Sequence, residues 1–349
     1  MSLEETVRRI EALDERAMRL ARERQDNLTK PRRSLGSLED LAIKIAGITG
    51  NPLPKITEKV IITMAGDHGV TDEGVSVFPK EVTAQMIFNF LRGGAAINVL
   101  ARHVGARIVV VDMGVAAALQ DERLVSRKIA YGTANITKGP AMTHEDALRS
   151  IEAGIDVLEL ETEKGMDIVG VGDMGIGNTT PSSAITAVIT GEAVRAVTGR
   201  GTGIDDTMLE RKIQVVEEAL RVNQPKRRDP IDVLAKVGGF EIGGMAGVML
   251  AAAAHRIPIV IDGFISGAAA LIAYKLAPGV KEYMIAAHRS VERGHAGILE
   301  YLELTPLLDL NMRLGEGSGA ALGISIVDAA CKILTEMATF GEAGVAEQL

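Results

Sequence analysis

Residues 59–69 read KVIITMAGDHG, an apolar run that ends in glycine, aspartate and histidine. Four further short apolar runs follow along the chain, at residues 107–111, 167–171, 258–261 and 283–286. Segments with helical periodicity separate them. Apolar strands that alternate with helices are typical of a parallel sheet covered on both faces. The sequence therefore predicts a three-layer α/β fold with helices on both faces of a parallel sheet.

The two ends of the chain show helical patterns only. Residues 3–26 predict one charged amphipathic helix, which the capping-box pattern Ser2-x-x-Glu5 opens. A second such box, Ser37-x-x-Asp40, predicts the start of another helix, and residues 318–340 are again helical. We expect a small helical subdomain made of residues 1–50 together with 305–349. Residues 51–304 then form the large α/β domain that carries the active site.

Composition excludes several classes of protein. The 349 residues carry a net charge of −8 and only 3% aromatic side chains, which disfavours nucleic acid as a partner. Cys331, the one cysteine, lies in an apolar stretch and is expected to be a buried thiol. The start of the chain lacks the pattern of a secretion signal, and Pro258 and Asp262 interrupt the most apolar window, residues 257–274. We expect a cytoplasmic protein without a membrane partner.

Polar residues follow every predicted strand. Four aspartates stand at these positions, and histidines stand beside two of the strand ends: Asp67, Asp112, Asp173, Asp262, His68 and His288. Ligands of open parallel sheets bind at the carboxyl ends of the strands. The sequence therefore predicts a site at this edge. The six histidines are scattered without metal-ligand spacing, so no metal site is expected.

Residues 170–175 read GVGDMG and match the glycine pattern of dinucleotide-binding turns. The next helix is expected to begin near Pro181, and Glu192, about the required distance onward, follows a helical run rather than a strand. A phosphate or ribose loop that uses the Thr179 and Thr180 hydroxyls is the more economical interpretation, and a plain tight turn stays open. Asp205 and Asp206 indicate a helix start. On that helix Arg211 or Lys212 could reach a phosphate, but a face exposed to solvent is the usual interpretation.

Residues 314–319 read LGEGSG, a glutamate between glycines just before an apolar helix. Such a backbone can approach a ligand closely. The alternative is an ordinary helix start, capped by Ser318. The neighbouring Arg313 either binds a carboxylate or phosphate or faces solvent.

Eight segments, taken in order, resemble one family: the nicotinate-nucleotide–dimethylbenzimidazole phosphoribosyltransferases of cobalamin lower-ligand synthesis. They cover nearly the whole chain: residues 30–39 (KPRRSLGSLE), 65–70 (AGDHGV), 81–86 (EVTAQM), 93–102 (GGAAINVLAR), 172–180 (GDMGIGNTT), 241–253 (EIGGMAGVMLAAA), 262–270 (DGFISGAAA) and 314–322 (LGEGSGAAL). The resemblance implies a Rossmann-like large domain, a small helical domain and a homodimer. It implies transfer of 5-phosphoribosyl from nicotinate mononucleotide to 5,6-dimethylbenzimidazole, giving α-ribazole 5′-phosphate and nicotinate, without a metal or cofactor.

The resemblance also assigns site residues. It makes Glu316 the general base that takes the proton from the second imidazole nitrogen. The nucleotide-binding residues it implies are Asp173, Gly175, Gly177, Asn178, Thr179, Lys212, Asp262, Ser290 and Arg313. Those implied for the acceptor base are Phe78, Gln85 and Leu314. Asp173 stands where some relatives carry glutamate, and Phe78 where relatives often carry smaller or polar side chains.

Two other functions stay open at this point. A nicotinamide-dependent oxidoreductase would use the glycine pattern of residues 170–175 and would bind NAD(P). A binding protein without catalytic activity would capture a nucleotide or azole at the strand ends and would not depend on Glu316. The glutamate between glycines favours the enzyme, because binding alone has little use for a proton acceptor there.

Overall fold

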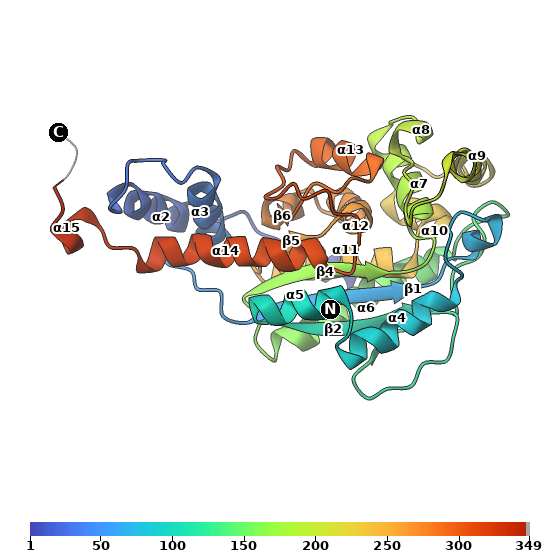
Figure 1. The fold of residues 1–349 in the computed structure, drawn as a ribbon, viewed down its shortest axis with the longest axis horizontal. Coiled ribbons are helices and arrows are strands. Elements are labelled where there is room, and N and C mark those ends of the chain that lie inside the picture. Colours follow the sequence, from blue (N-terminus) through green and yellow to red (C-terminus); the bar gives the residue numbers. More distant parts are fainter. Residues whose placement is uncertain (347–349) are drawn as a thin grey trace.

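A computed structural model describes residues 1–346, and within them six strands form one parallel sheet. Its spatial order is β3-β2-β1-β4-β5-β6 (Figure 1). The strands are β1 (Lys59–Gly66), β2 (Ala106–Gly114), β3 (Val125–Ser126), β4 (Ile168–Met174), β5 (Ile259–Ile261) and β6 (Met284–Ala286). The predicted parallel α/β sheet is confirmed. Sequence patterns missed β3 because it has two residues, too few to show a strand periodicity.

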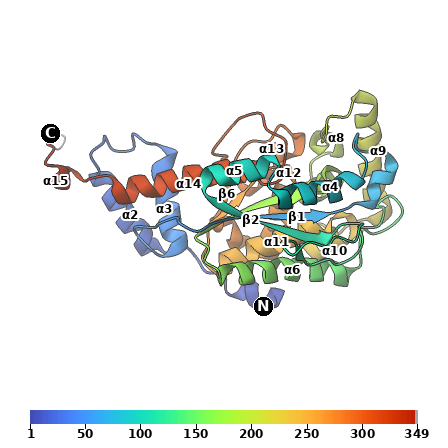
Figure 2. The same cartoon turned by 60° about the horizontal axis from the view of Figure 1, so that its bottom comes forward.

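Helices cover both faces of the sheet, as expected for three layers (Figure 2). One face packs against α4 (Glu81–Arg92), α5 (Ala96–Val104) and α14 (Ser318–Glu336). The other packs against α11 (Phe240–Ala254) and α12 (Phe264–Leu276), and α6 (His144–Thr162) lies on α11. Every residue of α11 is buried, which explains why its sequence is apolar around the whole helix.

The strand order changes direction beside β1. This strand pairs with β2 on one side and with β4 on the other. Such a switch point is the usual ligand position in open parallel sheets, so a site is expected near the carboxyl end of β4. The remaining elements are α7 (Thr179–Thr190), α8 (Val194–Val197), α9 (Asp206–Asn223), α10 (Pro230–Val237), α13 (Arg293–Leu302) and the 3₁₀ turns η1 (Gly69–Glu73) and η2 (Pro278–Tyr283).

The two ends of the chain meet. α2 (Glu15–Asn27) and α3 (Ser37–Thr49) pack against α14, and a bridge pairs Leu28 with Thr339 just before α15 (Phe340–Ala343) (Figure 1). Arg24 also donates to the Leu334 carbonyl across 2.8 Å. The division into domains at residues 50 and 304 stays a prediction.

The predicted single helix over residues 3–26 is wrong. α1 (Leu3–Arg8) ends early and packs against α6 and α11, whereas α2 begins at Glu15 and packs against α3. Asp14 separates them, because its side chain caps α2 by accepting from the Ala17 N–H. The capping box at Ser2 is confirmed. The box at Ser37 is wrong, because Gly36 is the cap residue and no side chain caps α3.

α14 is the one helix in residues 1–346 that is long and apolar enough to cross a membrane. However, 61% of its most apolar window is buried inside the protein, between the sheet, α3 and α5. Cys331 lies on this helix, and it is buried as expected. Burial raises the pKa of its thiol to about 12, so the thiol is unreactive at neutral pH.

Candidate active site

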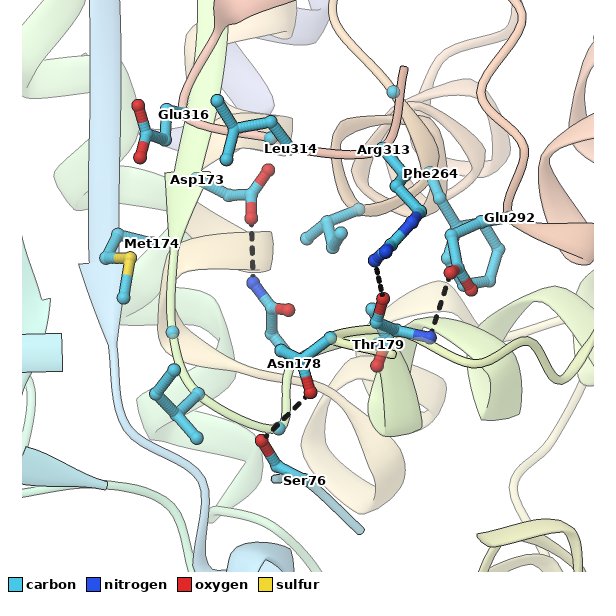
Figure 3. A pocket seen from close by; sticks show the side chains of 18 of the residues that line it. Ser76, Asp173, Met174, Asn178, Thr179, Phe264, Glu292, Arg313, Leu314 and Glu316 are labelled. Atoms are coloured by element: carbon cyan, nitrogen blue, oxygen red, sulfur yellow. Dashed lines mark hydrogen bonds between the residues drawn. The ribbon is translucent and has the colours of Figure 1, made fainter. Parts of the chain in front are cut away.

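A cavity of about 430 Å³ opens at the carboxyl ends of β4, β5 and β6. Most of the residues implied by the family resemblance line it: Phe78, Asp173, Gly175, Gly177, Asn178, Thr179, Ser290, Arg313, Leu314 and Glu316. Figure 3 shows Glu316 and Asp173 on one side of this cavity and Arg313, Thr179 and Glu292 on the other. The structure thus brings together the strand-end loop after β4 and the segment before α14.

The backbone of Glu316 is held in an unusual conformation against the sheet. Its φ is +65°, and its neighbours Gly315 and Gly317 have φ of +82° and +95°. The Glu316 carbonyl accepts from the Thr63 hydroxyl of β1 at 2.9 Å. A Cβ on Gly172 would stand 2.2 Å from the same carbonyl oxygen, so only glycine fits at Gly172.

The glycine pattern of residues 170–175 therefore has a packing cause. A Cβ on Gly170 would press on Ala320 at 3.0 Å, and one on Gly175 would meet the Gly66 carbonyl at 2.3 Å. These glycines allow α14 and the loop after β4 to lie close to the sheet. The dinucleotide interpretation loses the feature that suggested it.

The Glu316 carboxylate is largely buried at the cavity wall, with a relative exposure of 6% for the residue. Its Oε2 accepts from the Ile97 N–H at the start of α5, at 3.3 Å. Burial raises the pKa of Glu316 above its usual 4.5, and the hydrogen bond from Ile97 opposes this shift. A carboxylate with a raised pKa is a better proton acceptor near neutral pH than an exposed one.

Two further carboxyl groups lie beside Glu316. Asp262 accepts from the N–H groups of Gly317, Gly319 and Ala320, so Asp262 rather than Ser318 caps α14. Burial raises the pKa of Asp262 to about 7.

Asp173 accepts from the Asn178 side chain at 2.8 Å, a contact drawn in Figure 3. Burial, and next the charge of Asp262, raise its pKa to about 8. Ionisation of all the buried carboxyl groups at this edge of the sheet at the same time is therefore unfavourable.

The other two strand-end aspartates serve the scaffold. Asp112 pairs with the Lys128 ammonium at 2.9 Å, and Asp67 accepts from the Ala116 N–H at 2.8 Å. Neither lines the cavity. Of the four aspartates expected to converge, only Asp173 lines the cavity, with Asp262 behind it.

The polar side of the cavity carries positive charge. α7 begins at Thr179, two residues earlier than predicted, so the N-terminus of this helix lies at the cavity wall. Lys212 of α9 donates to the Thr179 hydroxyl at 2.7 Å and is fully buried. Burial lowers the pKa of Lys212 to about 8. The solvent-facing interpretation of Lys212 is wrong, because the loop before α9 folds over it. The helix start predicted at Asp205 and Asp206 is confirmed: α9 begins at Asp206, and the Asp205 side chain caps it.

The cavity also has an extensive apolar lining. The apolar side chains that line it are Val75, Phe78, Val82, Met86, Met174, Ile176, Phe264, Ile265 and Leu314. Gln85, expected to contact the acceptor, does not line the cavity but is exposed on α4. The helical turn presents its neighbours Val82 and Met86 instead. A flat aromatic ligand fits this lining better than a charged one.

His288, one of the two strand-end histidines expected at the site, lines the cavity, whereas His68 does not. Four other cavity residues carried no sequence signal that we recognised: Gly201, Thr202, Phe264 and Glu292. Glu292 follows β6, so its position after a strand could have identified it. Gly201 and Thr202 belong to the segment between α8 and α9, whose place at the cavity depends on tertiary packing. Within residues 1–346 no group of three or more His, Cys, Asp or Glu side chains is arranged to hold a metal ion.

Comparison with known proteins agrees with this geometry. A family model described as phosphoribosyltransferase matches residues 10–345. The nicotinate-nucleotide–dimethylbenzimidazole phosphoribosyltransferase of Chloroflexus aggregans is 61% identical over 99% of this chain and 98% of its own length. The enzyme of that name from Roseiflexus sp. is 62% identical over 98% of both chains.

A crystal structure of the Thermus thermophilus enzyme of the same name has a TM-score of 0.91. It is 44% identical, and the match covers 96% of this chain and all of the other. These matches span both the sheet and the helical ends. The chain belongs to the nicotinate-nucleotide–dimethylbenzimidazole phosphoribosyltransferase family.

Proposed function

We propose that this enzyme transfers 5-phosphoribosyl from nicotinate mononucleotide to 5,6-dimethylbenzimidazole, giving α-ribazole 5′-phosphate and nicotinate. The names of its relatives support both substrates. The observation that carries the proposal is the position of Glu316, a buried carboxylate at the wall of a cavity that has cationic groups on one side and an extensive apolar lining. Such a cavity suits a phosphorylated donor and an aromatic acceptor together.

The proposed reaction requires one proton acceptor. One imidazole nitrogen of the acceptor forms a bond to C1′ of the ribose, while the bond from C1′ to the pyridinium nitrogen breaks. The electron pair of the broken bond remains on the leaving nicotinate and neutralises its ring nitrogen. The second imidazole nitrogen loses its proton to the Glu316 carboxylate. Atoms and charge balance with no further reactant.

The donor is proposed to occupy the polar side. Its phosphate would lie at the start of α7, where Gly177, Asn178 and Thr179 provide the wall, and Arg313 and Ser290 complete it. Lys212 contributes charge from behind Thr179. Gly175 lets this loop approach the sheet closely. Asp262 acts indirectly, because it holds the start of α14, and Asp173 faces the donor ribose.

The acceptor is proposed to lie on the apolar side, between Phe78 and Leu314. These two side chains are 51% and 55% exposed, which is unusual for large apolar groups around one cavity.

Because of this exposed apolar rim, we also propose a homodimer, in which Phe78 and Leu314 are covered. Light scattering during size-exclusion chromatography tests it, and a monomer at micromolar concentration contradicts it. A cytoplasmic location remains part of the proposal.

A product assay tests the proposed reaction. Purified enzyme is mixed with nicotinate mononucleotide and 5,6-dimethylbenzimidazole without added metal, and the products are separated by chromatography and identified by mass spectrometry. We expect nicotinate and α-ribazole 5′-phosphate in equal amounts. Turnover only with another azole or with a phenol would mean that this base is the acceptor and that the Phe78 side chain contributes to its selection. Binding of the donor without turnover of any acceptor would contradict the proposal.

A further inference from the structure

Residues 198–203 read TGRGTG and pass over the polar side of the cavity, where Gly201 and Thr202 line it. The peptide groups on both sides of Gly201 are hydrogen-bonded to side chains. The Gly201 N–H donates to Oε1 of Glu292 at 2.9 Å, and the Gly201 carbonyl accepts from Arg313 at 2.8 Å. Three segments far apart in the sequence therefore meet at one glycine.

Glu292 is an unusual side chain for such a place. It is 6% exposed, and its second oxygen, Oε2, is buried without a hydrogen-bond partner among the residues that the structure describes. Gly199 makes room for this oxygen, because a Cβ there would stand 2.1 Å from it. A buried carboxylate with an unpaired oxygen is costly, so a neighbouring cation has to compensate it.

The Lys212 ammonium also lies close to Gly201. A Cβ on Gly201 would stand 3.2 Å from the Lys212 ammonium and 2.8 Å from the Thr179 hydroxyl. The Glu292 carboxylate and the Lys212 ammonium thus approach the same glycine, one through its N–H and the other from the side of α9. The charge of Glu292 favours the charged form of Lys212, whereas burial of the ammonium opposes it.

We propose that Glu292 is a positioning residue for the phosphorylated donor. Its carboxylate fixes residues 198–203 against Arg313, and its charge balances the buried Lys212 ammonium. Glu292 touches neither the ribose nor the acceptor in this role; it acts through Gly201 and Lys212. The proposal rests on the proposed function, because it assigns the donor phosphate to the Lys212 side of the cavity.

Steady-state kinetics on two variants tests this role. Glu292→Gln keeps an acceptor for the Gly201 N–H but removes the charge, whereas Glu292→Ala removes both. We expect the KM for nicotinate mononucleotide to rise about tenfold in Glu292→Gln and about a hundredfold in Glu292→Ala. The KM for 5,6-dimethylbenzimidazole and the kcat should change by less than about twofold. Amide hydrogen exchange of residues 198–203 should become faster in Glu292→Ala only.

Glu161→Gln is the matched control. Glu161 is also a buried glutamate, but it pairs with Arg107 and Lys164 at the opposite end of the sheet. Its replacement should lower stability without changing either KM. Equal rises in both KM values for the Glu292 variants, or no rise in Glu292→Ala, would overturn the proposal.

A separate binding measurement distinguishes this inference from the proposed reaction. Titration calorimetry with nicotinate mononucleotide alone requires no turnover. If the wild-type enzyme forms no α-ribazole 5′-phosphate but the Glu292 variants still bind the nucleotide about tenfold more weakly, the reaction is wrong and the role of Glu292 stands. Unchanged nucleotide affinity in both variants, with normal wild-type turnover, would reject the role of Glu292 alone.

Discussion

Glu316 combines a strained backbone with a buried acid, and this combination makes its side chain the most informative one to change. Glu316→Gln keeps the size of the side chain and can still accept from the Ile97 N–H. We expect normal folding by circular dichroism and a kcat lower by about 10²- to 10⁴-fold, because the proton acceptor is lost. Turnover at the wild-type rate would show that another group takes the proton.

The pH dependence of the reaction follows from the same residue. Burial raises the pKa of Glu316, and only its ionised form accepts a proton. We expect kcat to rise with pH through a pKa above 4.5 and this acidic limb to be absent from the residual rate of Glu316→Gln. Because Asp173 also titrates in this range, Asp173→Asn is the control and should retain the limb. If the acidic limb disappears in Asp173→Asn instead, Asp173 rather than Glu316 is the proton acceptor.

Single residues differed in how far their sequence context revealed their surroundings. The glycines beside Glu316 signalled a close backbone approach, and the structure contains that approach at Gly172. Lys212 gave the wrong signal, because a lysine on an amphipathic helix normally faces solvent. Only the tertiary fold shows that Thr179 and the segment before α9 enclose it. The catalytic role of Glu316 stays a prediction.

At the scale of elements, β4 and the segment before α14 can pack closely only because residue 172 is a glycine and has no side chain. In Gly172→Ala the new Cβ would stand 2.2 Å from the Glu316 carbonyl oxygen and 2.5 Å from the Gly317 nitrogen, both of them backbone atoms. We expect α14 to be displaced, with a loss of about 1–3 kcal/mol in the free energy of unfolding and little remaining activity. Urea denaturation and the product assay measure the two effects.

Gly139→Ala is the control for this substitution, because nothing lies within 4 Å of a Cβ there. Its stability and activity should match those of the wild type. Equal effects of the two substitutions would mean that the contact between β4 and the Glu316 segment is not what positions the carboxylate.

Helices and strands with a long pattern were predicted correctly. Predictions were wrong where a single residue sets the boundary of a helix. The main strands and helices followed from apolar runs and helical periodicity. A continuous helix over residues 3–26 failed because the cap at Asp14 starts a new helix, although aspartate is a recognisable cap. β3 could not be predicted, since its two residues pair with β2 only after the chain has folded.

For the molecule as a whole, the acidic edge of the sheet predicts an unusual pH dependence of stability. The pKa of Asp173 is raised from 3.8 to about 8 in the folded state. The neutral form is therefore favoured on folding, and the contribution of Asp173 to stability is complete below about pH 4 and is lost as the pH rises towards 8. We expect Asp173→Asn to stabilise the ligand-free enzyme, because the amide oxygen still accepts from Asn178 and no charge has to be buried.

This gain should increase with pH, by at most about 1.4 kcal/mol for each pH unit between about 4 and 8. Thermal unfolding at several pH values measures it. Asp156→Asn, on the exposed face of α6, should show no such increase. A gain that is independent of pH would mean that packing, rather than the buried charge, limits stability at Asp173.

The overall architecture was the most predictable level, because the α/β alternation and the strand-end rule both follow from local patterns. The cavity was less predictable: its polar side depends on residues 198–203, which no motif placed there. Assignment of the acceptor side also erred at Gln85, since a helix presents residues three or four apart and sequence alone does not show which of them face inward.

Glu316 and the helix that follows it come after all six strands in the chain. A ribosome adds residues in that order, so the sheet and the loops around the polar side are synthesised before the carboxylate that faces them. α14 then extends about 28 Å from that carboxylate towards α2 and α3, which were made first. The ribosome therefore makes the sheet and the polar side of the cavity first, and the nascent chain gains its proposed general base only when most of its residues have been synthesised.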